Sequence, residues 1–455
     1  MRRIVSSPAL LVAAVAAYAL LRLTEVLTAS PFIDYDSDQY ARVAAHPLWS
    51  HGFLAGEKPF VLPLLWKLLP GPAVHVSPNL VYGDIRPALL AQVVVSIVCW
   101  TVLALVVARS LRHFGARVLA VAAILGFSCS MGITQWDHTL ISESLSLSLL
   151  ALLLAAALVL MQRPSGVTVA AALGAMFLWT FTRDTNAFYV LIGGPLLALV
   201  LARRGWMRLA LPLAVGALLI VGASRSTASI ADRGGLPTRN VMVFALASDP
   251  QFERFFVDHG MPNQPGLAQR LGQRPPNLYF TDPRLVQFRR WFARSGERTY
   301  YEWLATHPGK LFGPPLRSFG RLYTPKPSEL AVYRDYQPLP RVLPAWVDPF
   351  FFPGSSAGLA ALLALAVAGF AFAVAGRRVT RLDAVPLAFL AATLPVAILI
   401  WHGDSVELDR HLFQGTALTR LSLLVLVLLA ADRVLEWAYE RGRVPVGLQP
   451  KGETA

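Results

Sequence analysis

The chain has 455 residues, of which 55% are hydrophobic and only 15% are charged. With a mean hydropathy of +0.51, this composition excludes a disordered chain, a collagen-like fibre and a small disulfide-stapled module, and it indicates a protein of the lipid bilayer. The two cysteines, Cys99 and Cys129, lie inside apolar runs, so we expect packed thiols and not a disulfide framework or a cysteine-built metal site. The formal net charge is +14, from 41 Lys and Arg against 27 Asp and Glu.

Stretches of mostly apolar residues recur along the whole chain. A membrane-spanning helix needs about 20 such residues, and we count about ten stretches of that kind. They are residues 8–28, 87–108, 117–134, 140–161, 166–182, 186–202, 207–224, 355–376, 382–401 and 411–431. The third, fifth and sixth are short or carry polar interruptions. The sequence therefore predicts an all-α polytopic membrane protein.

Charges in the short connections predict the direction of these helices. Arginines cluster in the connections on one face, which marks it as the cytoplasmic face. The acidic residues near the membrane, among them Asp36 and Asp184, lie on the opposite face. We therefore expect a multi-pass protein of the bacterial inner membrane with both termini in the cytoplasm. Residues 1–19 could also be a cleaved signal peptide, but an uncleaved first helix is favoured because it anchors the acidic loop that follows.

Two connections, residues 30–86 and residues 225–345, are too long to be turns, and they define the predicted organisation of the chain. Residues 225–345 hold 17 Lys and Arg against 9 Asp and Glu and are rich in aromatic residues, which predicts a folded basic domain with mixed or helical structure. The predicted parts are an N-terminal transmembrane module (1–224) with its first outer loop (30–86), an extracytoplasmic domain (225–345), C-terminal transmembrane helices (346–434) and a cytoplasmic tail (435–455).

Both long connections contain segments with the pattern of amphipathic helices. Leu285, Phe288 and Phe292 recur at helical spacing, and we expect one or two short helices there that lie against the membrane. Residues 60–69 have the composition of an interfacial helix, with Trp66 as a natural anchor.

The densest acidic feature follows the first predicted helix and consists of Asp34, Asp36 and Asp38. Carboxylates at the membrane surface can deprotonate a hydroxyl nucleophile or hold a divalent cation. Alternatively, Asp36 is an N-cap with Gln39 at the third helical position, opening a helix that runs through Ala45. The two roles are compatible.

Lysine is scarce in this sequence, and Lys58 lies in the first outer loop within Gly56-Glu57-Lys58-Pro59. Because the proline fixes the backbone beside it, an outer lysine here is a reasonable phosphate contact. The alternative is an interfacial lysine whose stem packs on apolar surface while its ammonium group reaches water.

The last outer connection carries imidazole and carboxylate groups, which are common metal ligands. Asp404 and Glu407 are the candidates for a divalent cation, and Glu407 is four residues before His411, so the two could share one helical face. A mixed-charge loop that caps two membrane helices explains the same residues.

The run Asp36-Ser-Asp-Gln-Tyr40-Ala-Arg-Val-Ala44, followed by Glu57-Lys58-Pro59, resembles the first outer loop of the GT-C membrane glycosyltransferases. It is most similar to the protein O-mannosyltransferase and lipid A aminoarabinose transferase branch. There an Asp-Glu-x-x-Tyr-Ala pattern opens the loop and a Lys-Pro-Pro-Leu pattern follows further along. Ser37 and Phe60 stand here in place of the glutamate and the second proline.

Three later positions extend the resemblance to most of the predicted membrane part. Glu143 at the start of the fourth predicted span is similar to the second acidic position of the family. Arg183, between the fifth and sixth spans, is similar to its Leu-x-x-Arg helix, and Arg410-His411-Leu412 resembles its Arg-Tyr-Leu pattern. As alternatives, Glu143 could simply complement a helix N-terminus, and Arg183 could form an interfacial ion pair with Asp184.

The resemblance implies a GT-C fold and transfer of a sugar, with inversion, from a polyprenyl-phosphate donor to a cell-envelope glycan or protein on the extracytoplasmic face. The sequence lacks a glycine-rich nucleotide cradle, and no nucleic-acid partner is expected. By resemblance, Asp36 is the base that activates the acceptor hydroxyl, and Asp38 is the fallback. By the same resemblance, the residues expected to bind the donor phosphate are Lys58, Arg183 and Arg410. The residues expected to line the site are Tyr40, Glu57, Glu143 and His411.

Two other classes of function stay open. A transporter or flippase of lipid-linked glycans would carry charged residues near the bilayer midplane and broken helices, whereas the ionisable residues here cluster at the ends of the predicted spans. A non-catalytic GT-C relative that scaffolds envelope assembly is compatible with Ser37 and Phe60. Recognition of the acceptor is expected in residues 225–345, where no motif is found.

Overall fold

The structure, a computed structural model, describes most of the chain. The described residues are 8–28, 35–69, 75–77, 80–82, 86–233, 241, 249–264, 267, 282–324, 342–351, 356–376, 379–403 and 408–442. The long helices are α1 (Pro8–Thr28), α5 (Arg86–Ser110), α6 (Phe114–Ser128), α7 (Met131–Asp137), α8 (Ser142–Gln162), α9 (Gly166–Thr180), α10 (Asn186–Arg203), α11 (Met207–Ile230), α22 (Ser356–Ala375), α23 (Ala384–Gly403) and α24 (Leu408–Glu440), α7 being a short continuation of α6.

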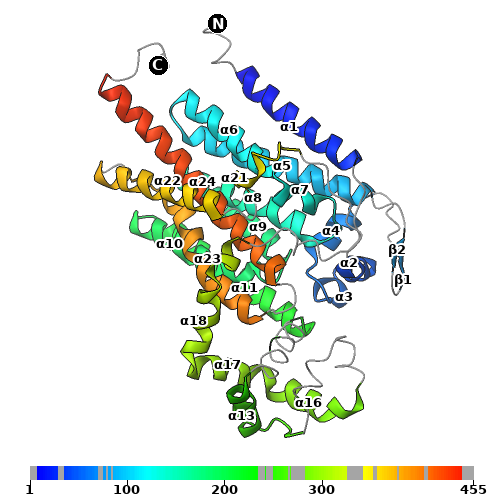
Figure 1. Ribbon diagram of the computed structural model, residues 1–455. Helices are drawn as coiled ribbons and strands as arrows, with labels where there is room; N and C mark the ends of the chain where they lie inside the picture. Colours follow the sequence, from blue (N-terminus) through cyan, green and yellow to red (C-terminus); the bar gives the residue numbers. More distant parts are fainter. Residues whose placement is uncertain are drawn as a thin grey trace.

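These helices form one bundle, and the chain enters and leaves it at the same end. Helix α1 begins and helix α24 ends at one end, while the short helices of residues 249–324 lie beyond the other (Figure 1). We call the second end the distal end. The short helices are α13 (Pro250–Asp258), η1 (Pro283–Leu285), α16 (Val286–Trp291), η2 (Phe292–Gly296), α17 (Glu297–Thr306), α18 (Pro308–Arg317) and α19 (Phe319–Tyr323).

The helix count agrees with a polytopic membrane protein. Within the described residues, eight helices are long and apolar enough to cross a membrane, or nine if α6 and α7 form one span. All ten predicted stretches correspond to helices, and the stretch 117–134 is divided between α6 and α7. Helices α6 and α7 are bent by 53° at the break between them. Helix α9, with 15 residues, is shorter than the eight candidate spans.

Burial separates the centre of the bundle from its lipid-facing rim. In the most apolar stretches of α24 and α8, 94% and 83% of the residues are buried, against 17% in α1 and 11% in α22. Helix α8 packs against α5, α9, α23 and α24, so it is the central helix. Close packing uses small residues: a Cβ on Gly194 of α10 would lie 2.7 Å from the Cβ of Ala217 in α11. Both cysteines are free and buried, as predicted.

Two helices run past predicted domain boundaries, and one charged residue lies where none was expected. Helix α11 runs to Ile230, beyond the predicted boundary at 224, and helix α24 runs to Glu440, beyond that at 434. Arg420 lies well inside α24, is buried, and donates a hydrogen bond to the carbonyl of Phe351 at 3.1 Å. The prediction that ionisable residues keep to helix ends is therefore wrong at Arg420.

The first outer loop folds into short elements that pack on the distal end of the bundle. They are α2 (Tyr35–Ala45), α3 (His51–Leu54), α4 (Val61–Lys67) and an antiparallel hairpin of β1 (His75–Ser77) and β2 (Leu80–Tyr82). The helix predicted to end at Ala45 is confirmed, but Asp36 lies in its first turn and is not its N-cap. Trp66 is buried and packs against Tyr40 at 6.4 Å between ring centroids, so its predicted role as a membrane anchor is wrong.

Residues 249–324 contain a separate aromatic core beyond the bundle. The predicted helical spacing of Leu285, Phe288 and Phe292 is confirmed, but these side chains are buried in a cluster with Phe252 and Trp303. The expectation that they lie against the membrane is wrong, because their apolar face is already covered by the other helices of this segment. Helices α18 and α19 connect the segment to the bundle through contacts with α23 and α24.

Candidate functional site

Five charged side chains, each from a different segment, form a continuous series of ion pairs at the distal end. Lys58 Nζ lies 2.9 Å from Asp36 Oδ1, and Arg410 Nη2 lies 2.8 Å from Asp36 Oδ2. Arg410 Nε donates to Glu143 Oε1, and Arg183 Nη1 lies 3.0 Å from the same oxygen. We call these five residues the charged cluster. Its charges alternate, and three cations against two carboxylates leave a net charge of +1.

Local structure places both carboxylates at helix N-termini. Asp36 lies in the first turn of α2 and Glu143 in the first turn of α8, where the helix dipole stabilises negative charge. The alternative role of Glu143 as a dipole partner is therefore fulfilled together with its place in the cluster. Arg410 lies in the first turn of α24 and joins the two carboxylates, although it is far from both in the sequence.

The cluster is open at one end and closed at the other. The side chains of Lys58 and Asp36 are 21% and 18% exposed, whereas that of Glu143 is 1% exposed. Arg183 and Arg410 lie between these extremes and are also buried. A ligand would thus meet Lys58 and Asp36 first. Buried charges persist only where they are paired, which explains why Glu143 has two arginines and Asp36 has an arginine and a lysine.

Tyr40 and Ser37 fix helix α2 against the start of α8. Tyr40 donates a hydrogen bond to Ser142 Oγ at 2.8 Å, and Ser37 donates one to the carbonyl of Leu140, also at 2.8 Å. Lys58 Nζ lies 5.5 Å from the centre of the Tyr40 ring, so Tyr40 lies beside the cluster. Ser37 is fully buried, which gives a packing reason for a small residue where the GT-C branch has glutamate.

Arg183 and His411 close the inner end of the cluster. Arg183 Nη2 lies 3.0 Å from His411 Nδ1, so His411 lies beside the cluster, and its lining role stays a prediction. The alternative ion pair between Arg183 and Asp184 is wrong. Asp184 instead pairs with Arg233, three residues after the end of α11.

Two of the predicted site residues do not join the cluster. Glu57 points to Arg42, whose Nε and Nη2 lie 2.5 and 3.0 Å from its two carboxylate oxygens, in an exposed pair. Asp38 is buried in α2, and no ion pair connects it to another residue in the part of the chain that the structure describes. Asp36 is therefore the aspartate of this helix that faces the cations.

The predicted divalent cation stays a prediction. Asp404 and Glu407 lie outside the described residues, so their positions are not part of the site geometry. Among the residues that the structure does describe, no group of three or more His, Cys, Asp or Glu side chains is placed to hold a metal ion. Within the charged cluster, a cation at Asp36 would compete with Lys58 and Arg410.

The charges of the cluster hold Asp36 and Lys58 in their ionised forms. Burial disfavours ionisation of Asp36, but Lys58 and Arg410 outweigh it and lower the pKa of this carboxyl well below its ordinary value of 3.8. Burial likewise opposes the charge of Lys58, yet Asp36 raises the pKa of the ammonium group above its ordinary value of 10.5. Asp36 is thus a strongly neutralised carboxylate and, in this state, a weak base.

The depressed pKa of Asp36 makes a prediction for the pH dependence of stability. A folded-state pKa below the unfolded value adds stability above the unfolded pKa that is lost only as the pH falls through the folded pKa. We therefore expect the stability difference between the wild type and Asp36→Asn to stay constant between about pH 5 and pH 8. Thermal unfolding of both proteins in detergent across this range measures it. A difference that shrinks already near the middle of the range would contradict the ion-pair geometry.

Two arginines of the long connection contact the neighbours of the cluster. Arg233 Nε and Nη2 lie 2.9 and 3.0 Å from the carboxylate of Asp184, and its Nη1 donates to the carbonyl of Gly56 at 2.7 Å. Arg321 Nε and Nη2 lie 2.8 and 3.1 Å from the carboxylate of Asp409. Sequence analysis missed both pairs because nothing in the spacing of these residues connects them.

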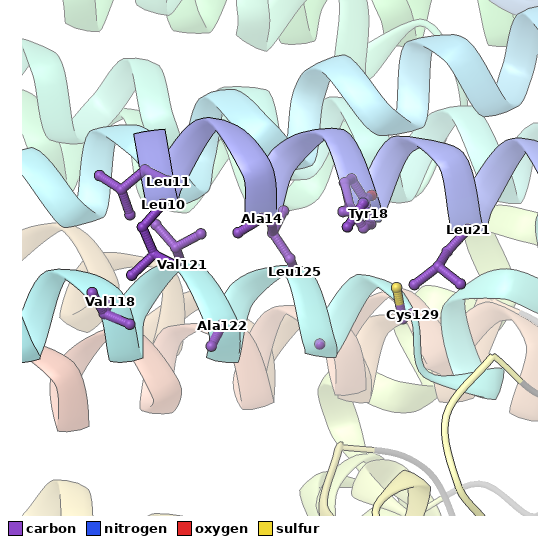
Figure 2. Close-up of a pocket in the computed structure, with 12 residues that line it drawn as sticks. Leu10, Leu11, Ala14, Tyr18, Leu21, Val118, Val121, Ala122, Leu125 and Cys129 are labelled. Atoms are coloured by element: carbon purple, nitrogen blue, oxygen red, sulfur yellow. The ribbon is translucent and has the colours of Figure 1, made fainter. Parts of the chain in front are cut away.

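An apolar crevice of about 300 Å³ lies between α1 and α6, apart from the charged cluster (Figure 2). Among the described residues that line the crevice, only Tyr18 and Cys129 have polar side-chain atoms. The remaining lining residues are Leu10, Leu11, Ala14, Ala17, Leu21, Val118, Val121, Ala122, Leu125 and Gly126. This surface suits hydrocarbon chains of the bilayer, so the chemistry of the protein is to be sought at the charged cluster.

Similarity to known proteins is found among solved structures. No protein-family model and no curated protein matches the sequence. The archaeal oligosaccharyltransferase AglB from Archaeoglobus fulgidus, solved with an inhibitory peptide and a dolichol-phosphate, is similar with a TM-score of 0.44 and 13% identity, over 97% of this chain and 52% of that one. ArnT from Cupriavidus metallidurans in the apo state has a TM-score of 0.33 and 15% identity, over 93% and 77%.

The chain therefore spans about half the length of the archaeal oligosaccharyltransferase. The observed all-helical bundle agrees with the predicted fold class. The chemistry of the site rests on the residues of this chain.

Proposed function

We propose that this protein is an inverting membrane glycosyltransferase that moves a sugar from a polyprenyl-phosphate donor to a cell-envelope acceptor. The observation that carries the proposal is the charged cluster. A carboxylate accessible to solvent, Asp36, lies between two cations, Lys58 and Arg410, at the end of a bundle of apolar helices. A lipid-linked phosphate anchored in the bilayer would present its charge at this level.

The cations of the cluster suit a phosphate group. Arginine binds phosphate through two parallel N–H groups, and lysine acts as a point charge. In the structure, Asp36 forms ion pairs with both Lys58 and Arg410. A donor phosphate would take over these two cations, and the net positive charge of the cluster would favour its binding.

Donor binding would also change the basicity of Asp36. The pKa of this carboxyl is low because Lys58 and Arg410 neutralise it. Once the phosphate engages both cations, the pKa of Asp36 rises, and a carboxylate with a higher pKa is a better general base. Binding of the donor thereby prepares the base for the acceptor.

The transfer step then balances as follows. The acceptor hydroxyl attacks the anomeric carbon from the face opposite the phosphate and gives its proton to Asp36. The bond between the anomeric carbon and the phosphate oxygen breaks, and its electron pair stays on the phosphate, where Lys58 and Arg410 stabilise the charge. Attack from the opposite face inverts the anomeric configuration. The step needs no nucleotide and no redox partner.

The proposal includes an orientation, with the distal end outside the cytoplasm of a bacterial cell and both termini inside. Arginine-rich connections at the other end of the bundle support it. Residues 225–345 would then face the acceptor, since their described helices lie beyond the distal end (Figure 1). A reporter enzyme that works only outside the cytoplasm should be active when it is fused next to Tyr40.

The test compares lipid extracts and envelope glycans of a strain lacking the gene with those of the complemented strain. We expect one polyprenyl-phosphate sugar to accumulate in the deletion strain and one envelope modification to disappear, both reversed by the wild-type gene. Purified protein in vesicles should then form a new glycosidic bond when donor and acceptor are supplied.

Two other outcomes would contradict the proposal. Movement of labelled lipid across the vesicle membrane, without an acceptor and without bond formation, would establish a transporter. Restoration of the growth of the deletion strain by an Asp36→Asn gene would indicate a scaffold.

A further inference from the structure

Each cation of the charged cluster lies within two residues of a group that forms hydrogen bonds with an arginine of the long connection, residues 225–345. Arg233 binds the carbonyl of Gly56, two residues before Lys58, at 2.7 Å. The same guanidinium binds both carboxylate oxygens of Asp184, the residue after Arg183. The side chain of Arg233 is 5% exposed and that of Asp184 is 28% exposed, so the guanidinium is buried while its carboxylate partner is partly open to water.

The third cation is held from the other end of the long connection. Arg321 of α19 binds both carboxylate oxygens of Asp409, the residue before Arg410. The side chain of Asp409 is 4% exposed, and helix α19 packs along α24. Arg321 thus fixes the first turn of α24, from which Arg410 reaches the two carboxylates of the cluster.

We propose that Arg233 and Arg321 are positioning residues that set the anion affinity of the charged cluster. They act through Lys58, Arg183 and Arg410, and they make the long connection part of the donor site. This inference rests on the proposed function. It adds that residues 225–345 serve the donor side of the reaction besides facing the acceptor.

The path of the chain at Gly56 explains why its carbonyl contact matters for Lys58. A Cβ at Gly56 would collide with the backbone oxygen of Gly52 and approach the side chain of Val43 to 2.8 Å. This turn therefore has little room to move toward α2. Arg233 binds the carbonyl of the same glycine, so loss of its guanidinium removes a restraint on the turn and on the lysine that follows it.

Arginine geometry is essential to this role. A guanidinium has N–H groups in a fixed plane and can serve a carboxylate with two of them while a third reaches a carbonyl, which an ammonium group cannot reproduce. We therefore expect Arg233→Lys to be intermediate between the wild type and Arg233→Ala. Displacements of about 1 Å in a binding constellation can change its performance by up to about a hundredfold.

The first experiment measures binding of farnesyl phosphate, a short isoprenyl phosphate, to the full-length protein in lipid nanodiscs. Arg233→Ala and Arg321→Ala should each weaken binding by about tenfold to a hundredfold. The matched control is Arg284→Ala, because Arg284 binds both oxygens of Asp282 within the same connection but next to none of the three cations. It should leave the affinity unchanged. Equal affinities of wild type and both variants would overturn the inference.

A double-mutant comparison separates positioning from a general loss of structure. In a Lys58→Ala/Arg183→Ala background, Arg233→Ala should cause no further loss of affinity, because the side chains through which it acts are already absent. A further loss equal to that in the wild-type background would show that Arg233 acts elsewhere and would overturn its assignment. If Arg233→Ala does not fold, Arg233→Lys takes its place in both experiments.

Hydrogen–deuterium exchange tests the inference without any ligand. Arg233→Ala should speed exchange of the backbone amides in residues 54–60 and 181–187, and Arg321→Ala should do so in residues 408–412. Arg284→Ala should change none of these segments. If the wild type does not bind farnesyl phosphate, the proposed function fails, and the exchange rates alone decide on Arg233 and Arg321. Unchanged exchange in these segments would refute both positioning roles.

Discussion

Replacing Asp36 with asparagine is expected to lower glycosyl transfer by about 10² to 10⁴ fold, the usual contribution of a general base. The amide keeps the shape of the carboxylate but cannot accept the proton of the acceptor hydroxyl. The protein should still reach the membrane in normal amount, because Arg410 keeps Glu143 as a partner and Lys58 is partly open to water. Transfer is measured with the accumulated lipid-linked sugar as donor, and protein abundance by immunoblot of the membrane fraction.

Two variants in the same loop serve as controls for Asp36→Asn. Glu57→Gln removes a carboxylate that contacts Arg42 in an exposed pair outside the cluster, so transfer should stay near the wild-type rate. Asp38→Asn makes the same chemical change two residues further along α2. Because Asp38 does not face the cations, its loss should affect transfer far less than that of Asp36. Wild-type turnover in Asp36→Asn, together with an inactive Asp38→Asn, would assign the base to Asp38.

Replacing Arg22 with alanine is expected to lower the free energy of unfolding by about 3–5 kcal/mol, the cost of leaving a buried charge unpaired. Arg22 is fully buried in α1, where it donates to the carbonyl of Ser128 at 2.6 Å and to the carboxylate of Asp137. Its Nε also lies 3.2 Å from Glu25 Oε2. Removing the guanidinium leaves two buried carboxylates without their shared cation. Unfolding in mixed micelles with increasing SDS measures the change.

Arg42→Ala is the matched control for Arg22→Ala. It also removes an arginine from a carboxylate, but Arg42 and Glu57 are 46% and 43% exposed, and exposed pairs contribute up to about 1 kcal/mol. The loss of unfolding free energy in Arg22→Lys should lie between those in Arg22→Ala and Arg42→Ala, since lysine keeps the charge and loses part of the hydrogen bonding. A loss in Arg22→Ala as small as that in Arg42→Ala would mean that Asp137 and Glu25 do not depend on this cation.

The buried contacts of Arg22 also reach toward the charged cluster. Ser144, the residue after Glu143, donates a hydrogen bond to Asp137. His138 Nε2 lies 3.2 Å from Glu25 Oε1. The pairing of Arg22 with Glu25 was visible in the sequence because the two are three residues apart on one helical face. The contact with Asp137 was not, since it depends on how α1 packs beside the break between α6 and α7.

The candidate site was partly predictable. Asp36, Lys58, Glu143, Arg183 and Arg410 were chosen from motifs, and the structure brings all five together. Glu57 was chosen on the same grounds and points elsewhere. A motif specifies which residue types occur at neighbouring positions, such as Asp36 and Asp38 or Glu57 and Lys58. The orientation of α2 and of the turn before α4 decides which member of each pair points into the charged cluster.

By itself, the sequence determined the apolar helices, their order and the end of the bundle at which acidic residues gather. Apolar length and charge asymmetry are properties of continuous segments, so they can be recognised without knowing how the segments pack. Only the tertiary structure decided which charges pair. Asp36 forms ion pairs with Lys58 and Arg410. Glu143 pairs with Arg183, and Asp184 pairs with Arg233. Pairing of charges depends on the rotation and contact of helices far apart in the chain, and adjacency in the sequence, as between Arg183 and Asp184, does not determine it.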